Sequence, residues 1–275
     1  MKRKVLLLFI SGFYCFYAGA QSFQDEFIKA FNRNDMTKAE EILKAWDLSN
    51  ANDPELYIAF FNFYTFKSMN AKGPMTTGYD RHYSKQALEF ITEGIERFPL
   101  RLDMRVAKIY LLSELKAYPE FVSEILKLIV FSNKIKNDWK DTDFLSVENA
   151  DDTFFGFVTE CQEILFSKED STLFKDILRI SDEMLKYYPK HVQSRIAVST
   201  VYIAQKEFDK SLNSLLKALE MERTNVITLF NIAYVYVLKG DATNARKYYE
   251  LTIKHSGEKE IKIKEAAEKE LKSLP

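Results

Sequence analysis

The residue types that most often carry out catalysis are sparse in this sequence. Its three histidines, His82, His191 and His255, lie far apart along the chain and belong to no HExxH pair. No GxSxG turn, CxxC pair or glycine-rich phosphate loop occurs. Carboxylate pairs are common, but with 29% charged residues they arise by chance on any exposed helix face. The sequence therefore predicts a protein that is not an enzyme and has no catalytic, cofactor-binding or metal-binding residues.

One long connection could still carry a site. The stretch 67–82 exceeds the two to eight residues usual between packed helices, and long ordered loops are often functional. It follows a predicted helix at 54–66 whose aromatic residues cover more than one face. That pattern favours burial between neighbouring helices, with a ligand-stacking platform as the alternative. An envelope enzyme or a glycan-binding protein would place its site here, at Tyr64, Asp80, Arg81 and His82.

A second break in the helical pattern, residues 136–153, is rich in acidic residues. A partner-binding loop, a cation site and a solvated insertion are all compatible with it. The acids lack the fixed spacing and the glycine turn of a calcium loop, which favours solvation. Cys161 follows this break on a predicted helix, and we interpret it as a small core residue in preference to a reactive thiol.

The N-terminus has the layout of a secretory signal peptide. Three basic residues at positions 2–4 precede an apolar run at 5–17, and Ala18-Gly19-Ala20 then predicts cleavage after Ala20. The run is shorter than the ~20 residues of a spanning helix, which favours cleavage over an uncleaved anchor. Tyr14 before Cys15 argues against a lipoprotein. We therefore expect a periplasmic or secreted protein with no membrane span after leader removal.

Charge narrows the class of partner. Without the three basic leader residues, 36 Lys and Arg face 40 Asp and Glu, so the net charge is −4 with histidine neutral. Both signs are interspersed, whereas binding to a phosphate backbone needs positive charge concentrated on one face. Nucleic acid is therefore not an expected partner. Only 8 Gly and 6 Pro among 275 residues, with 47% hydrophobic residues, predict long helices around a core.

Near the C-terminus the sequence repeats itself. Residues 192–225 and 226–259 share one 34-residue pattern of aromatic, small and apolar positions, in which Tyr202 corresponds to Tyr236 and Leu215 to Tyr249. Small residues allow two antiparallel helices to approach closely, and larger ones fill the gaps between hairpins. The second window resembles a tetratricopeptide repeat, through Ile232, Ala233, Tyr236, Gly240, Asp241, Ala245 and Tyr249.

The resemblance implies an all-α fold, an α-solenoid of antiparallel helical hairpins. We expect a single helical-repeat domain over 21–275, with divergent hairpins at 21–190 and clear repeats at 192–225 and 226–259. The segment 260–274 alternates apolar residues with Lys and Glu, and it predicts the capping helix that closes such a stack.

In tetratricopeptide proteins the first helix of each hairpin lines a concave groove. The resemblance therefore implies groove positions Gln193, Ile196, Thr200, Ile203, Ile227, Phe230, Asn231, Tyr234 and Val237. Repeats that clamp acidic chaperone tails need Lys and Asn where Ile196 and Thr200 stand, so such a tail is not the expected ligand. An apolar groove instead suits an amphipathic helix or an extended segment. The resulting prediction is a non-catalytic scaffold of the cell envelope for a protein or peptide, with homo-oligomerisation through the groove as a further possibility.

Overall fold

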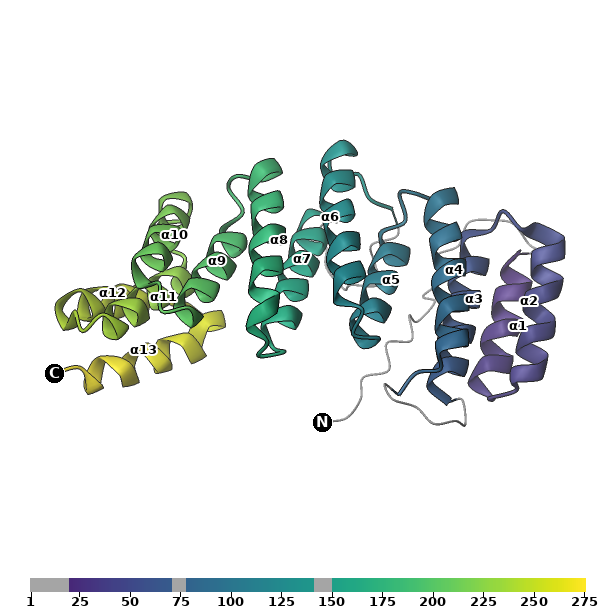
Figure 1. Ribbon diagram of the computed structural model, residues 1–275, viewed down its shortest axis with the longest axis horizontal. Helices are drawn as coiled ribbons and strands as arrows, with labels where there is room; N and C mark the ends of the chain where they lie inside the picture. The colour runs from purple at the N-terminus through teal and green to yellow at the C-terminus, as the bar shows by residue number, and fades with distance from the viewer. Residues whose placement is uncertain (1–19, 71–77, 141–149) are drawn as a thin grey trace. The chain divides into compact units, whose positions relative to one another are not determined.

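The computed structural model describes residues 20–70, 78–140 and 150–275, and these residues form helices joined mostly by short turns (Figure 1). The predicted all-α fold of stacked antiparallel hairpins is confirmed. The predicted leader through residue 19 and the central parts of the two long breaks, residues 71–77 and 141–149, lie outside the described residues. The chain separates into two compact units, one ending at Phe155 and the other beginning at Gly156.

The described residues of the first unit form three hairpins. Its helices are α1 (Ala20–Asn32), α2 (Met36–Asn50), α3 (Pro54–Asn70), α4 (Arg81–Arg97), α5 (Leu102–Glu114) and α6 (Tyr118–Lys134). Asp35 and Asp80 cap the starts of α2 and α4, where each carboxylate accepts a hydrogen bond from a backbone N–H three residues later. Such caps satisfy amide groups that have no partner within the helix.

Helix α3 lies at the centre of this unit. Phe60, Phe61 and Phe63 are all buried although they point to different sides, as the aromatic pattern predicts. Gly94 of α4 faces this helix so closely that a Cβ atom there would lie 2.8 Å from Cβ of Tyr57. The absence of a side chain at Gly94 therefore sets the spacing between α3 and α4.

The segment after α6 folds back onto the same unit. Trp139 is buried, and its indole N–H donates to Oγ of Ser132 at 3.0 Å. The next residue, Lys140, pairs with Arg101 in an isolated β-bridge. The beginning of the acidic break is thus ordered by a buried side chain and by backbone hydrogen bonds.

The second unit holds the repeats. Its helices are α7 (Ala150–Phe166), whose residues from Gly156 onward belong to this unit, α8 (Phe174–Tyr187), α9 (Val192–Ala204), α10 (Phe208–Met221), α11 (Val226–Leu238), α12 (Ala242–His255) and α13 (Ile261–Ser273). Two 3-10 turns, Ser171–Leu173 and Glu258–Glu260, precede α8 and α13. Helices α8, α10 and α12 have equal lengths and start 34 residues apart, so the structural repeat extends one hairpin upstream of the two windows that the sequence pattern indicates.

The last hairpin is covered as the sequence predicts. Gly240, with φ +75°, and the cap residue Asp241 make the turn between α11 and α12. Ala233, Ala245 and Tyr249 form a buried cluster with Ala267 of α13. Helix α13 therefore closes the apolar side of the final repeat, which otherwise would be exposed.

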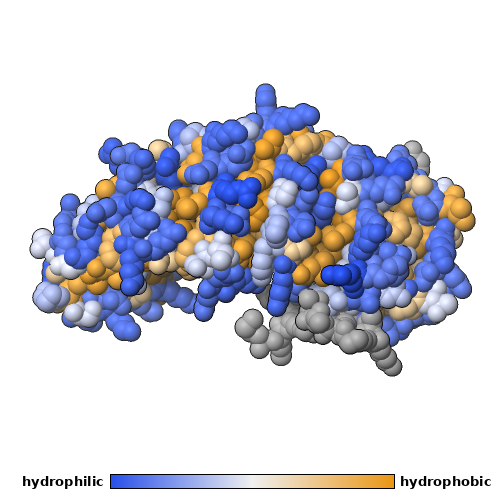
Figure 2. Space-filling view, viewed as in Figure 1, coloured by the Kyte–Doolittle hydropathy of each residue, from blue (hydrophilic) through white to orange (hydrophobic). Residues whose placement is uncertain are grey.

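No helix within the described ranges is long and apolar enough to cross a membrane. The face shown in Figure 2 is largely hydrophilic, and hydrophobic side chains show in bands between hydrophilic ones. Such bands are expected where the gaps between amphipathic helices reach the surface.

Candidate functional site

A cleft of about 210 Å³ opens in the second unit, between the first helices of two consecutive hairpins. We call it the α7–α9 cleft. Its lining is Thr159, Gln162, Glu163, Phe166 and Ser167 of α7 and the turn after it, Ile177 of α8, and Gln193, Ile196, Ala197 and Thr200 of α9. Three of the nine groove positions implied by the resemblance, Gln193, Ile196 and Thr200, thus line one concave site.

The two walls of the cleft are equivalent by the repeat. Thr159, Gln162, Glu163 and Phe166 precede the α9 residues Gln193, Ile196, Ala197 and Thr200 by 34 positions each. The cleft is therefore the groove between two copies of one structural unit. Sequence reasoning missed the α7 wall because the aromatic and small-residue pattern fades upstream of residue 192. Subtracting 34 from the groove positions on α9 would have found it.

Gln162 is the most buried polar residue of the cleft, at 2% exposure. Its Nε2 donates to Oγ of Ser181 at 2.7 Å, and that hydroxyl donates in turn to the Ile177 carbonyl at 2.9 Å. The amide orientation is thereby determined, since the hydroxyl hydrogen is already used. Oε1 of Gln162 is buried, and no described residue donates to it.

Two hydroxyl groups of the cleft donate their hydrogens to backbone carbonyls. Ser167 donates to the Ile164 carbonyl at 2.8 Å, and Thr200 donates to the Ile196 carbonyl at 3.0 Å. Each oxygen retains lone pairs that can accept. Glu163, the one charged residue of the ten, is exposed and adds a carboxylate. Ser167, Thr200 and Glu163 thus each present an oxygen that can accept a hydrogen bond.

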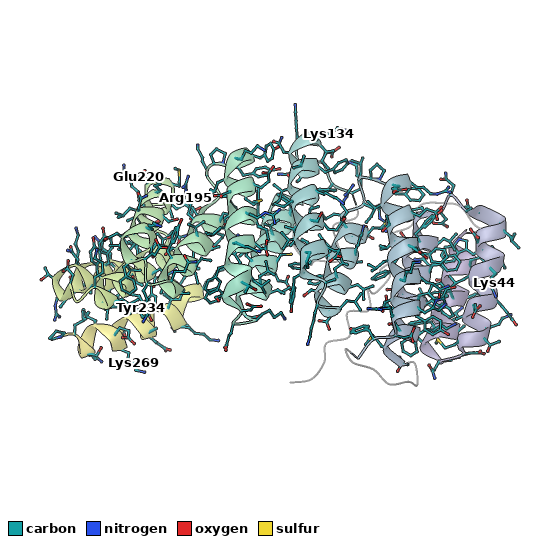
Figure 3. All side chains as sticks on the ribbon, viewed as in Figure 1. Lys44, Lys134, Arg195, Glu220, Tyr234 and Lys269 are labelled. Carbon is teal, nitrogen blue, oxygen red and sulfur yellow. The ribbon has the colours of Figure 1, made fainter. Side chains whose placement is uncertain are left out.

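The predicted groove positions on α11 divide into two groups. Ile227 and Tyr234, the latter labelled in Figure 3, are 39% and 40% exposed. Phe230 and Val237 instead pack against the cluster that contains α13, and the Phe230 ring lies 5.5 Å from that of Tyr249. Asn231 and Ile203 are half-buried. The capping helix thus covers part of the groove face of α11 and leaves Ile227 and Tyr234 accessible.

The four residues of the alternative site near the long connection have separate structural roles. The Asp80 carboxylate accepts from the backbone N–H of Tyr83 at 3.0 Å as the α4 cap, while Arg81 and His82 are exposed. Tyr64 belongs to an aromatic stack, 5.5 Å from Phe90 and 6.4 Å from Tyr83 between ring centroids. Tyr64 thus reaches this end of α4 through Tyr83, and the contacts that the structure describes for the Asp80 carboxylate are those of a helix cap.

The Cys161 thiol and the possible metal-binding side chains do not form a further site among the described residues. Cys161 is fully buried, and burial raises the pKa of its thiol well above the usual value, so the reactive thiolate is disfavoured. Within the described ranges, no three His, Cys, Asp or Glu side chains are grouped as a metal site would require.

Several solved structures are similar to this chain at low identity. The tetratricopeptide repeat protein YrrB, described as having an unusual peptide-binding site, is 13% identical over 82% of this chain and 97% of its own, with a TM-score of 0.43. A tetratricopeptide repeat protein from Parabacteroides merdae is 14% identical over 94% of each chain, with a TM-score of 0.42. The thermophilic protein TTC0263 from Thermus thermophilus is 14% identical over 92% of this chain and 98% of its own, with a TM-score of 0.31.

No curated protein matches the sequence. Residues 227–254, which span nearly all of α11 and α12, match the family model of the tetratricopeptide repeat. The match falls on the second of the two windows in which the sequence shows its 34-residue pattern. Residues 227–254 of this chain therefore form a tetratricopeptide repeat.

Proposed function

We propose that this chain is a non-catalytic scaffold of the cell envelope that binds a protein or peptide in the groove formed by α7, α9 and α11. One observation carries the proposal: equivalent positions of α7 and α9 form the two walls of a concave, largely apolar cleft. Stacked helical repeats present extended concave surfaces of this kind for binding other proteins.

The exposed side chains of α11 extend the same surface. Ile227 and Tyr234 lie 34 residues after Gln193 and Thr200, at equivalent groove positions, and both are exposed. Tyrosine is enriched at binding surfaces because its ring is large and rigid and its hydroxyl remains compatible with water. Apolar burial on this face suits an amphipathic helix or an extended segment of a partner.

The envelope location rests on the predicted leader at residues 1–20 and is tested separately. The protein would be expressed with its N-terminus intact and recovered from the periplasmic or extracellular fraction. Mass spectrometry of the recovered chain is expected to show Gln21 as its first residue. Recovery of the intact chain from the cytoplasm would contradict the location and leave the binding groove unaffected.

Binding is tested by affinity capture with an Ile227→Ala/Tyr234→Ala variant beside the wild type. Both residues are exposed, so their truncation is expected to preserve the fold. The matched control is Leu216→Ala/Met221→Ala on α10, which removes two apolar side chains that are 38% and 41% exposed. A partner captured by the wild type and the control but lost by the groove variant supports the proposal. Equal capture by all three proteins would contradict it.

Light scattering on the same three proteins tests self-association. If the groove binds a second copy of this chain, the wild type and the control are dimeric and the groove variant is monomeric. A monomeric wild type would direct attention to a different protein as the partner.

A further inference from the structure

We propose that the α7–α9 cleft binds an arginine side chain of the partner. The inference rests on the proposed function, because it names the group that the groove would recognise. It follows from the hydrogen-bonding character, the charge and the size of the cleft, which are independent of the exposed residues on α11.

The acceptors of the α7–α9 cleft favour a ligand that donates hydrogen bonds. The hydroxyl hydrogens of Ser167 and Thr200 are used on backbone carbonyls, and Oε1 of Gln162 is a buried acceptor that no described residue satisfies. A buried acceptor without a donor is costly, so a ligand that supplies an N–H group gains more here than on open surface. Gln193, half-buried on the opposite wall, has an amide that can accept as well as donate.

The charge of the cleft selects a cation among donors. Glu163 is its one charged residue, and it lies one position after Gln162 on α7. A guanidinium group has five N–H donors in a flat fork and carries a positive charge at all physiological pH values. When the Gln162 side chain turns toward the cleft, one such group can donate to its Oε1 and remain close to the Glu163 carboxylate, whereas an indole or a hydroxyl offers a single neutral donor.

The size and the walls of the cleft suit one long side chain. Its volume of about 210 Å³ is below the roughly 300 to 1,000 Å³ of pockets for small-molecule ligands. Ile177, Ile196 and Ala197 provide apolar surface for the three methylene groups of arginine. The Phe166 ring is 36% exposed at the α7 wall and can stack on a planar guanidinium.

The test uses three small probes and the protein labelled at its isoleucine methyl groups. The probes are N-acetyl-arginine methylamide, its citrulline analogue, which is neutral with nearly the same shape, and its norleucine analogue, which has only the apolar stem. The Ile177 and Ile196 methyl signals report on the cleft, and Ile253, on α12, serves as the reference. The arginine probe is expected to shift both cleft signals and to bind about ten times more tightly than the citrulline probe.

Two substitutions then assign the contacts. Glu163→Gln is expected to weaken the arginine probe about five-fold and to leave the citrulline probe unchanged, because only the charge is removed. Gln162→Met, which removes the acceptor and preserves the length of the side chain, is expected to weaken both probes. Glu220→Gln on α10, labelled in Figure 3, is the matched charge control and is expected to change neither.

The proposal is overturned if the norleucine probe binds as tightly as the arginine probe, or if no probe shifts the cleft signals. It is also overturned if arginine binding is the same in wild type, Glu163→Gln and Gln162→Met. These results leave the proposed function standing when the Ile227→Ala/Tyr234→Ala variant still loses its partner. Conversely, if the Ile227→Ala/Tyr234→Ala variant captures the partner as well as the wild type does, the proposed function is wrong, whatever the probes show.

Discussion

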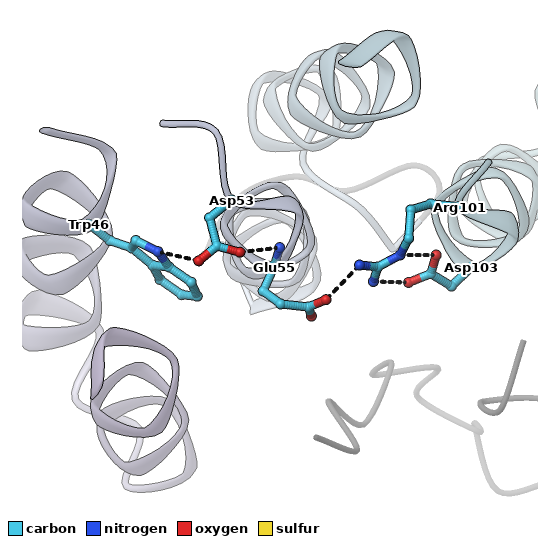
Figure 4. A network of polar contacts seen from close by, with 5 residues as sticks. All are labelled: Trp46, Asp53, Glu55, Arg101 and Asp103. Atoms are coloured by element: carbon cyan, nitrogen blue, oxygen red, sulfur yellow. Dashed lines mark hydrogen bonds and ion pairs between the residues drawn. The ribbon is translucent and has the colours of Figure 1, made fainter. Parts of the chain in front are cut away.

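The Arg101 guanidinium forms a two-point ion pair with the Asp103 carboxylate, at 2.9 Å from Nε to Oδ1 and 2.6 Å from Nη2 to Oδ2. Nη1 of Arg101 lies 2.7 Å from Oε1 of Glu55, which connects the start of α5 to the start of α3 (Figure 4). Arg101 and Asp103 are both buried. Planar two-point geometry of this kind compensates better for the loss of hydration than a single contact does.

Replacing Arg101 with Met is expected to lower the free energy of unfolding by about 3 to 5 kcal/mol, because it leaves the Asp103 carboxylate buried without its cation. Chemical denaturation followed by circular dichroism measures the change. The triple variant Glu55→Met/Arg101→Met/Asp103→Leu removes all three charges together, and it is expected to recover most of the loss. A triple variant no more stable than Arg101→Met would argue against a role for the stranded charge.

Gly94 and Gly156 form a matched pair of helical glycines. A Cβ at Gly94 would meet Cβ of Tyr57 at 2.8 Å and the sulfur of Met104 at 3.1 Å, whereas a Cβ at Gly156 would meet no atom within 4 Å. Gly94→Ala is expected to destabilise the protein by about 1 to 3 kcal/mol through overpacking. Gly156→Ala is expected to stabilise it by up to about 1 kcal/mol through helix propensity. Thermal unfolding of both variants checks the opposite signs, and a shift in the same direction would refute the close approach of α3 and α4.

His191 makes the second unit sensitive to acid. Its Nδ1 accepts from the backbone N–H of Ser194 at 3.3 Å as the cap of α9, and burial lowers the pKa of His191 from 6.5 to about 4. Between these two pH values the unfolded chain binds the proton and the folded protein does not. The free energy of unfolding therefore falls as the pH drops from about 6.5 to about 4, and above pH 6.5 this group causes no loss. Unfolding of the wild type measured at several pH values shows this dependence.

The control for this prediction is His191→Asn. Asparagine also caps helices but does not titrate, so the slope of stability between pH 6.5 and 4 is expected to be smaller in the variant. Identical slopes in the two proteins would assign the acid sensitivity to other groups.

Tyr249 and Tyr57 test how much a tyrosine hydroxyl contributes to the free energy of unfolding. Burial raises the pKa of Tyr249 to about 12, and no described residue hydrogen-bonds to its buried hydroxyl. Tyr249→Phe is therefore expected to leave the free energy of unfolding unchanged or to raise it by up to about 1 kcal/mol. Tyr57→Phe, which removes a donor to the Ala51 carbonyl at 3.0 Å, is expected to lower it by about 1 kcal/mol. Equal effects of the two substitutions would show that the Tyr249 hydroxyl has a partner.

Most of the helices could be predicted from the sequence because their signals are local. Asn225 and Asp241 cap α11 and α12, Gly240 has the positive φ of the turn between them, and the 34-residue pattern marks both hairpins of the repeats. Helix α13 was predictable from its alternation of apolar and charged residues, and α3 was predictable from its aromatic residues. Each of these features depends on residues no more than one repeat apart in the sequence, where spacing alone indicates which side chains share a face.

What the sequence by itself determined is therefore the fold class, most of the helices and the positions that share one face of α9 and of α11. Only the tertiary structure decided that Phe166 and Gln162 oppose Thr200 and Ile196, that α13 covers Phe230, and that Gln162 retains an unsatisfied acceptor. The physical reason is that local backbone preferences set helix type, whereas burial depends on how helices separated by many residues pack together. Phe230 is half-buried because it packs against the cluster that α11, α12 and α13 form together, whereas Tyr234 on the same helix is exposed.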